Sequence, residues 1–229
     1  MKSLQLMALV VCLAVASFAV DQNEQKVQGR VDAAGEILQQ LQSAPDQSIP
    51  EEVLGSAQCV AVVPSMKNGA FMVGMRYGRG VATCRTPKGW SAPAFFKLEG
   101  GSFGFQVGGE AIDVILLIMN DDGMEQLLSS KFKLGADASV AAGPVGRQAA
   151  AYTDWKMRAQ VLSYSRSRGA FAGLALNHGT IKQDKDSTRS FYGRMVPFKT
   201  SLTGVIPAPS NTYAFLDPLA KWAQVAADK

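Results

Sequence analysis

Residues 71–80 read Phe-Met-Val-Gly-Met-Arg-Tyr-Gly-Arg-Gly and indicate a β-strand. From Phe71 to Tyr77, every second position carries a large apolar or aromatic side chain. A period of two is typical of a half-buried strand, because successive side chains point to opposite faces of a sheet. Gly74 and Gly78 occupy the alternate positions of this stretch, and glycine on one strand face permits close packing or strong curvature. The stretch therefore predicts a half-buried strand in a sheet that can curve strongly.

Similar patterns recur further along the chain, in short segments with tight connections. Strands are expected at residues 103–107, 112–119, 134–140, 159–166, 171–177 and 180–183. The segment from Ile112 to Met119 is apolar on both faces, which predicts a central strand. Repeated short strands joined by turns favour an antiparallel sheet, strongly curved and able to curl towards a barrel.

Helices are predicted at both ends of the chain and once between the strands. Apolar residues recur at spacings of three and four from Val27 to Leu41, which is typical of an amphipathic helix. Gly29 and Gly35 weaken this helix, so its stability has to come from docking on the protein or on a membrane. Further helices are expected to start near Ser48–Glu51, at Asp122 and at Asp217-Pro218. The fold class is therefore α+β, with N-terminal helices and a helix inserted between strands.

Residues 1–19 are predicted to be a secretory signal peptide. The segment starts with a lysine, continues as a short apolar run, and carries the small residues Ser17 and Ala19 before the expected cleavage point. The mature chain would then consist of one domain at residues 20–195 and a proline-containing tail with a short helix at residues 196–229. We expect an exported protein, located in the periplasm or at the cell surface.

Lipidation at Cys12 is an alternative way to read the N-terminus. However, the bulky Val11 precedes this cysteine, and Cys12 lies within the apolar run rather than after it. Acylation would need a small residue before the cysteine, so cleavage without lipidation is favoured.

The composition indicates a globular and mildly basic protein. Hydrophobic residues make up 47% of the chain and charged residues 18%, and the formal net charge is +4. Loss of Lys2 with the signal peptide would lower this to about +3. Such a charge suits weak attraction to an anionic surface and does not require nucleic acid as a partner.

Cys59 and Cys84 would be the two cysteines of the mature chain. An even pair in an exported protein favours a disulfide, and the alternative is two unrelated buried thiols. Two cysteines this far apart and one histidine, His178, do not form a convincing metal-ligand set. No metal or other cofactor is expected.

The segment Gly100-Gly101-Ser102-Phe103-Gly104 matches the G-x-S-x-G motif of serine hydrolases, with His178 downstream as a candidate base. That motif needs a strand, a sharp turn and then a helix, whereas the residues after Ser102 alternate as a strand. The acidic pairs at residues 121–122 and 184–186 are typical of turns and helix starts rather than of catalytic carboxylates. The sequence therefore favours a non-enzymatic protein.

An ordered series of motifs is similar to the SYLF-domain family over roughly residues 30–195. The motifs are Phe71 to Gly80, Gly89 to Phe95, Gly100 to Gln106, Met119-Asn120, Gly143 to Arg147 and Tyr164 to Gly169. The resemblance implies binding rather than catalysis. Eukaryotic members bind phosphoinositide membranes, often through an N-terminal amphipathic segment, and some bind actin. In an exported bacterial member, cytoplasmic phosphoinositides and actin are not expected as partners.

We therefore expect non-enzymatic binding to anionic phospholipid membrane surfaces in the bacterial envelope. In this hypothesis the helix from Lys26 to Leu41 lays its apolar stripe on the membrane, while basic side chains meet lipid phosphates. The residues assigned to lipid binding are Lys26, Arg30, Val31, Leu38, Arg76 and Arg79. One alternative is a structural module that binds an envelope protein and docks the helix on its own sheet. A serine hydrolase is the remote alternative.

Overall fold

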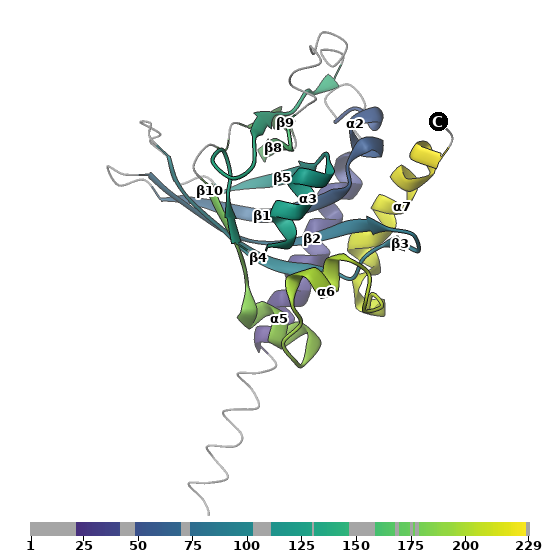
Figure 1. The fold of residues 1–229 in the computed structure, drawn as a ribbon. Helices are drawn as coiled ribbons and strands as arrows, with labels where there is room; N and C mark the ends of the chain where they lie inside the picture. The colour runs from purple at the N-terminus through teal and green to yellow at the C-terminus, as the bar shows by residue number, and fades with distance from the viewer. Residues whose placement is uncertain are drawn as a thin grey trace, which may run out of the picture.

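A curled β-sheet forms the centre of the structure, a computed structural model, and helices pack against it (Figure 1). The structure describes residues 22–41, 49–69, 74–102, 111–129, 131–146, 159–167, 170–174, 176 and 179–227. The strands are β1 Cys59–Gly69, β2 Gly74–Thr86, β3 Gly89–Trp90, β4 Ala94–Ser102, β5 Ile112–Ile118, β6 Lys131–Lys133, β7 Val140–Ala142, β8 Val161–Ser167, β9 Ala170–Gly173 and β10 Gly179–Gln183. The helices are the N-terminal helix (residues 22–41), α2 Glu51–Ser56, α3 Asp121–Leu128, α5 Lys185–Tyr192, α6 Phe198–Leu202, the 3-10 helix η2 Ser210–Thr212 and α7 Tyr213–Ala227.

The sheet is mixed, although most of its strand pairs are antiparallel. Its described strands follow the order β6-β10-β4-β2-β1-β5-β8-β7, with β3 paired to β2 and β9 paired to β8. The pair β7–β8 is parallel, with Val140 opposite Val161 and Ala142 opposite Ser163. The α+β class and the strong curvature are confirmed, whereas the expectation of a purely antiparallel sheet is wrong.

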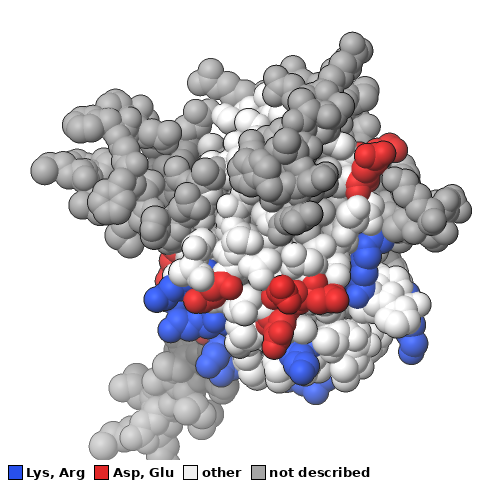
Figure 2. Space-filling model, turned by 45° about the horizontal axis from the view of Figure 1, so that its top comes forward, with Lys and Arg blue, Asp and Glu red and all other residues white. Residues whose placement is uncertain are grey.

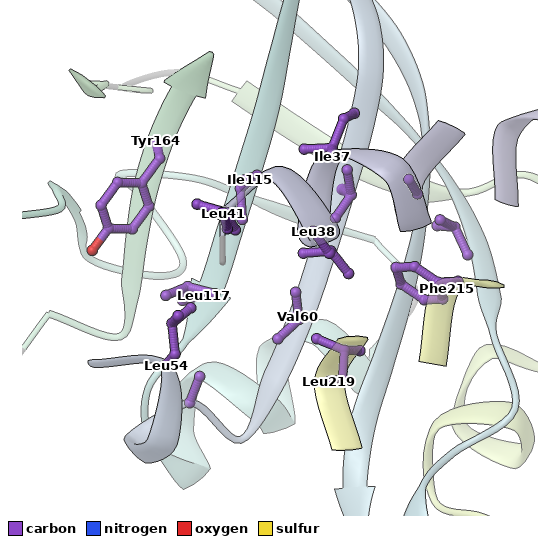
Figure 3. Close-up of a cluster of buried hydrophobic side chains, with 14 of the residues drawn as sticks. Ile37, Leu38, Leu41, Leu54, Val60, Ile115, Leu117, Tyr164, Phe215 and Leu219 are labelled. Atoms are coloured by element: carbon purple, nitrogen blue, oxygen red, sulfur yellow. The ribbon is translucent and has the colours of Figure 1, made fainter. Parts of the chain in front are cut away.

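Alternation along the inner strands divides the protein into two hydrophobic layers. Val60 and Val62 of β1 belong to the layer that contains the N-terminal helix, α2 and α7, whereas Ala61 and Val63 face the layer of α3 and α6. The predicted central strand is confirmed as β5, which lies between β1 and β8 and contributes side chains to both layers. Figure 3 shows Leu38, Val60 and Leu219 meeting in the first layer.

The predicted strand over residues 134–140 is wrong. β6 ends at Lys133, a turn follows, and β7 begins only at Val140. The Asp137 carboxylate accepts a hydrogen bond from the Lys133 backbone N–H at 2.7 Å, and Gly135 takes a positive φ of 84° within the turn. Leu134 and Ala138 are buried at the two ends of this turn, which imitates the period of a strand.

Two helix starts also differ from the expectation. Asn120, rather than Asp122, caps α3 by accepting a hydrogen bond from the Gly123 N–H at 2.9 Å. Helix α7 begins at Tyr213 and contains Pro218, so it starts about one turn before the expected position. The start of α2 at Glu51 agrees with the prediction, with Pro50 at the N-cap.

The residues assigned to the tail pack into both layers of the protein. Phe198 and Leu202 of α6 are buried in the second layer, and Phe215 and Leu219 of α7 in the first. Residues 1–19, Ser48, Phe71 and residues 103–107 lie outside the described residues, so the expectations for them stay predictions.

The Cys59–Cys84 disulfide is confirmed. It joins β1 to β2, where the two cysteines are direct cross-strand partners with Cα atoms 3.9 Å apart. Both side chains are buried in the second layer.

Candidate functional site

Arg30 and Arg79, two of the residues assigned to lipid binding, lie close together beside the N-terminal helix. Arg30 lies on that helix and Arg79 on β2, and both interact electrostatically with the same carboxylate, Asp184. Lys97 of β4 also lies close to Asp184. We call Arg30, Arg79 and Lys97 the cationic cluster.

Asp184 is the buried centre of this cluster. It is the N-cap of α5, where its carboxylate accepts hydrogen bonds from the Ser187 backbone N–H at 3.3 Å and from the Ser187 hydroxyl at 2.7 Å. Arg79 Nε and Lys97 Nζ each lie 3.6 Å from one of its oxygens. Burial alone would raise the pKa of Asp184, but the hydrogen bonds from Ser187 and the charges of Arg79 and Lys97 lower it further than burial raises it. The carboxylate is therefore ionised at neutral pH.

Arg30 is half-buried at the inner side of the cluster. Its Nη1 donates a hydrogen bond to the Ser187 hydroxyl at 3.0 Å. Burial lowers the pKa of Arg30, with the charge of Asp184 acting against this and the charge of Arg79 adding to it. Arginine nevertheless stays protonated in proteins, so the positive charge is kept.

Arg79 and Tyr77 form the outer side of the site. Arg79 Nε donates a hydrogen bond to the Tyr77 hydroxyl at 3.0 Å, and this bond is the main cause of the raised pKa of Arg79. The side chain of Arg79 is 42% exposed and Tyr77 is 40% exposed. A cation and an aromatic ring are thus presented side by side to solvent.

The site has more positive than negative charge. Besides Asp184, the exposed Asp186 lies 3.8 Å from Lys97, so three cations face two carboxylates. Figure 2 shows basic and acidic side chains interspersed on one described face of the molecule, with uncharged surface between them. The cationic cluster is therefore a local feature, built from donors that suit a phosphate or carboxylate ligand.

The other residues assigned to lipid binding lie in different surroundings. Lys26 is exposed on the N-terminal helix, one turn before Arg30. Val31 and Leu38 are completely buried against the sheet, so in this fold the apolar stripe faces the protein core instead of a membrane. Arg76 pairs with Asn68 and Gly100 in the strand register, and its side chain lies outside the described residues.

Lys97 and Asp184 are members of the site that the sequence did not assign to it. Asp184 was interpreted as a turn or helix start, and the structure confirms that reading because it caps α5. Lys97 is the direct cross-strand partner of Arg79. Their role depends on contacts between β2, β4 and α5, for which a single sequence carries no local signal.

The described residues bear on a metal site, but they do not include the side chains of the candidate hydrolase site. They contain no group of three or more histidine, cysteine, aspartate or glutamate side chains that could hold a metal ion. Ser102 ends β4, but its side chain and His178 lie outside the described part of the chain. Among the helices that the structure describes, none combines the length and the apolar character needed to cross a bilayer.

A comparison with protein families agrees with the motif resemblance. The family model described as "Ysc84: Las17-binding protein actin regulator" matches residues 99–222, just over half of the chain. The chain belongs to the Ysc84 (SYLF) family. The match continues beyond residue 195, so the matched region includes α6 and part of α7.

Curated relatives support the same assignment. SH3 domain-containing YSC84-like protein 1 is 33% identical over 171 residues in Rattus norvegicus, which is 74% of this chain and 50% of the relative. The Homo sapiens protein of that name is 32% identical over 180 residues, 76% of this chain and 52% of the relative. LAS seventeen-binding protein 3 of Saccharomyces cerevisiae is 35% identical over 178 residues, 76% of this chain and 38% of the relative. The chain spans about half the length, or less, of these SYLF relatives.

Proposed function

We propose that this SYLF protein is a non-enzymatic binding domain that attaches to anionic phospholipid surfaces through its cationic cluster. The observation that carries the proposal is the convergence of Arg30, Arg79 and Lys97, from three separate elements, around one buried carboxylate. The excess of cations and the exposure of Arg79 suit a negatively charged headgroup, and Tyr77 beside it suits a membrane–water interface.

The proposed attachment is electrostatic and does not require insertion of a helix. The apolar side chains of the N-terminal helix are buried in the first layer, where they stabilise the fold. Releasing them would expose several large side chains, each worth about 1.5–3 kcal/mol of burial. Arg30, and Lys26 one turn before it, can instead meet headgroups while the helix stays docked.

We also propose that the protein is exported to an oxidising compartment of the bacterial envelope. The N-terminal segment supports this through its signal-like pattern, and the Cys59–Cys84 disulfide supports it because structural disulfides persist outside the cytosol.

A vesicle flotation assay tests the proposed lipid binding. The chain lacking residues 1–19 should float with vesicles of phosphatidylcholine that contain phosphatidylglycerol, and not with phosphatidylcholine alone. Replacing Arg79 by glutamine should weaken this binding about fivefold, because a basic residue near an anionic membrane contributes about 1 kcal/mol. Lys88→Gln, an equal charge change in the hairpin between β2 and β3, serves as the matched control. Absence of flotation on both kinds of vesicle would exclude the proposal.

A second candidate function is binding of a protein partner. The names of the family and of its yeast member refer to Las17 binding and to actin regulation. The docked N-terminal helix also agrees with a module whose helix has a structural role. Co-sedimentation with actin filaments distinguishes this candidate, because a lipid-specific domain should remain in the supernatant.

A further inference from the structure

Basic residues occupy one register position on four neighbouring strands. Arg79 of β2 pairs with Lys97 of β4, Lys97 pairs with Lys182 of β10, and Lys182 pairs with Lys131 of β6. We call these four residues the basic row. Cross-strand partners share a sheet face, so the four side chains leave the sheet on the same side.

The basic row makes an unfavourable contribution to the stability of the sheet. Like charges that lie directly opposite each other on adjacent strands destabilise a sheet. Acidic neighbours offset part of the repulsion, since Lys97 lies near Asp184 and Asp186, and Lys182 Nζ lies 2.6 Å from Glu99. An anionic ligand along the row would remove the remaining repulsion.

The row is open to solvent along its length. The side chains of Arg79 and Lys182 are each 42% exposed, that of Lys97 is 25% exposed, and Lys131 is exposed at the edge of the sheet. Strands lie about 4.8 Å apart, so the row extends roughly 14 Å across the sheet. This length exceeds what one phosphate group can contact.

We infer that the basic row is the face with which the protein lies on an anionic phospholipid surface, contacting several lipid phosphates side by side. The inference rests on the proposed function and extends it, since Lys182 and Lys131 lie outside the cationic cluster. It assigns membrane contact to the sheet rather than to the apolar stripe of the N-terminal helix. Tyr77 lies next to Arg79 on the same sheet face and would reach the headgroup region beside the row.

Protection of a sheet edge explains only one member of the row. Lysine on an edge strand discourages pairing with other chains, and Lys131 lies on such a strand. Lys182, Lys97 and Arg79 belong to strands with neighbours on both sides, where no edge needs protection.

The double variant Lys131→Gln/Lys182→Gln tests the inference. Its affinity for phosphatidylglycerol-containing vesicles should fall roughly 30-fold, since two basic residues near an anionic surface are removed. The matched control is Lys88→Gln/Lys199→Gln, which removes two exposed lysines outside the row and should bind within about twofold of the unmodified chain. Lys131→Arg/Lys182→Arg should keep the affinity, and circular dichroism melting should show that all variants are folded.

The outcomes separate this inference from the proposed function. If Arg79→Gln weakens binding while Lys131→Gln/Lys182→Gln binds like the unmodified chain, the basic row is excluded and the cationic cluster alone carries the function. Equal losses of vesicle affinity in the row variant and in its matched control would also overturn the inference. The net charge of the protein, and not the position of the basic row, would then explain the binding. Failure of the unmodified chain to bind either vesicle would exclude the proposed function itself.

Discussion

Asp184 combines a structural and an electrostatic role in a single side chain. As the N-cap of α5 it satisfies the Ser187 N–H, and as a buried anion it holds Arg79 and Lys97 close together. Because its pKa lies below the ordinary value, the folded state binds this proton less readily than the unfolded chain does. The ionised form therefore stabilises the fold at neutral pH.

Replacing Asp184 by asparagine separates the two roles, because asparagine also caps helices well. We expect the free energy of unfolding at pH 7 to fall by about 1–3 kcal/mol, since the cations lose their buried counter-charge. The stabilisation by Asp184 is complete above its ordinary pKa of 3.8 and is lost as the pH falls through the lower pKa of the folded state. Urea unfolding from pH 7 to pH 2.5 should therefore show the two proteins converging at low pH.

Asp186→Asn is the control for this prediction. Its side chain is 73% exposed, so the same change of charge should alter the stability by less than about 0.5 kcal/mol. An equal effect of the two substitutions would contradict the buried role of Asp184.

The N-terminal helix shows how one element can have two glycines with opposite effects. Its buried stripe consists of Val27, Val31, Ala34, Ile37, Leu38 and Leu41. Gly35 lies against the first turn of α7, where a Cβ atom would be 2.1 Å from the Ala214 carbonyl oxygen. A Cβ atom on Gly29 would have no neighbour within 4 Å. The close approach of the N-terminal helix to α7 therefore requires a glycine at position 35, but not at position 29.

Alanine at each position should change the stability in opposite directions. Gly29→Ala should stabilise the protein by about 0.5–1 kcal/mol, because alanine favours a helix and meets no obstacle. Gly35→Ala should destabilise it by about 1–3 kcal/mol, because α7 has to move away. Thermal unfolding followed by circular dichroism measures both, and a shift of the same sign for the two variants would refute the docked position of the helix.

At the scale of the whole molecule, the two ends of the described chain close the same hydrophobic layer. The N-terminal helix contributes Leu38 to it, and α7 contributes Phe215 and Leu219, all completely buried. Trp90 of β3 fixes α7 further by donating a hydrogen bond from its indole N–H to the Leu219 carbonyl oxygen at 2.9 Å. The first layer therefore includes α7, which lies in the segment that the sequence analysis assigned to the tail.

Truncation of the chain after Pro209 should leave it largely unfolded. It removes Phe215, Leu216 and Leu219 from the core, and each such side chain contributes about 1.5–3 kcal/mol. The sum is comparable to the total stability of a typical domain, about 5–15 kcal/mol. Loss of near-ultraviolet circular dichroism would show this, with Val205→Ser at a 72% exposed position as a neutral control. A truncated chain that keeps a cooperative melting transition would mean that the chain up to Pro209 folds without α7.

Local patterns of side chains were sufficient to predict much of this fold. Period-two alternation and two-sided apolarity depend on neighbouring residues only. They correctly placed the segment around Tyr77 in a strand, and β5 in the interior of the sheet between two other strands. The helical spacing from Val27 to Leu41 was equally local. It identified a stripe that must be buried, but it could not say whether protein or lipid buries it.

The partners of these elements depend on contacts between distant parts of the chain. The N-terminal helix is buried because the curled sheet and α7 together offer a surface that matches its stripe, and Arg30 reaches Ser187 across 157 positions of sequence. The parallel β7–β8 pair and the turn that replaces a strand at residues 134–139 likewise follow from how the chain closes around its core. Composition and period are properties of short segments, whereas the register that aligns Arg79, Lys97, Lys182 and Lys131 exists only once four strands have paired.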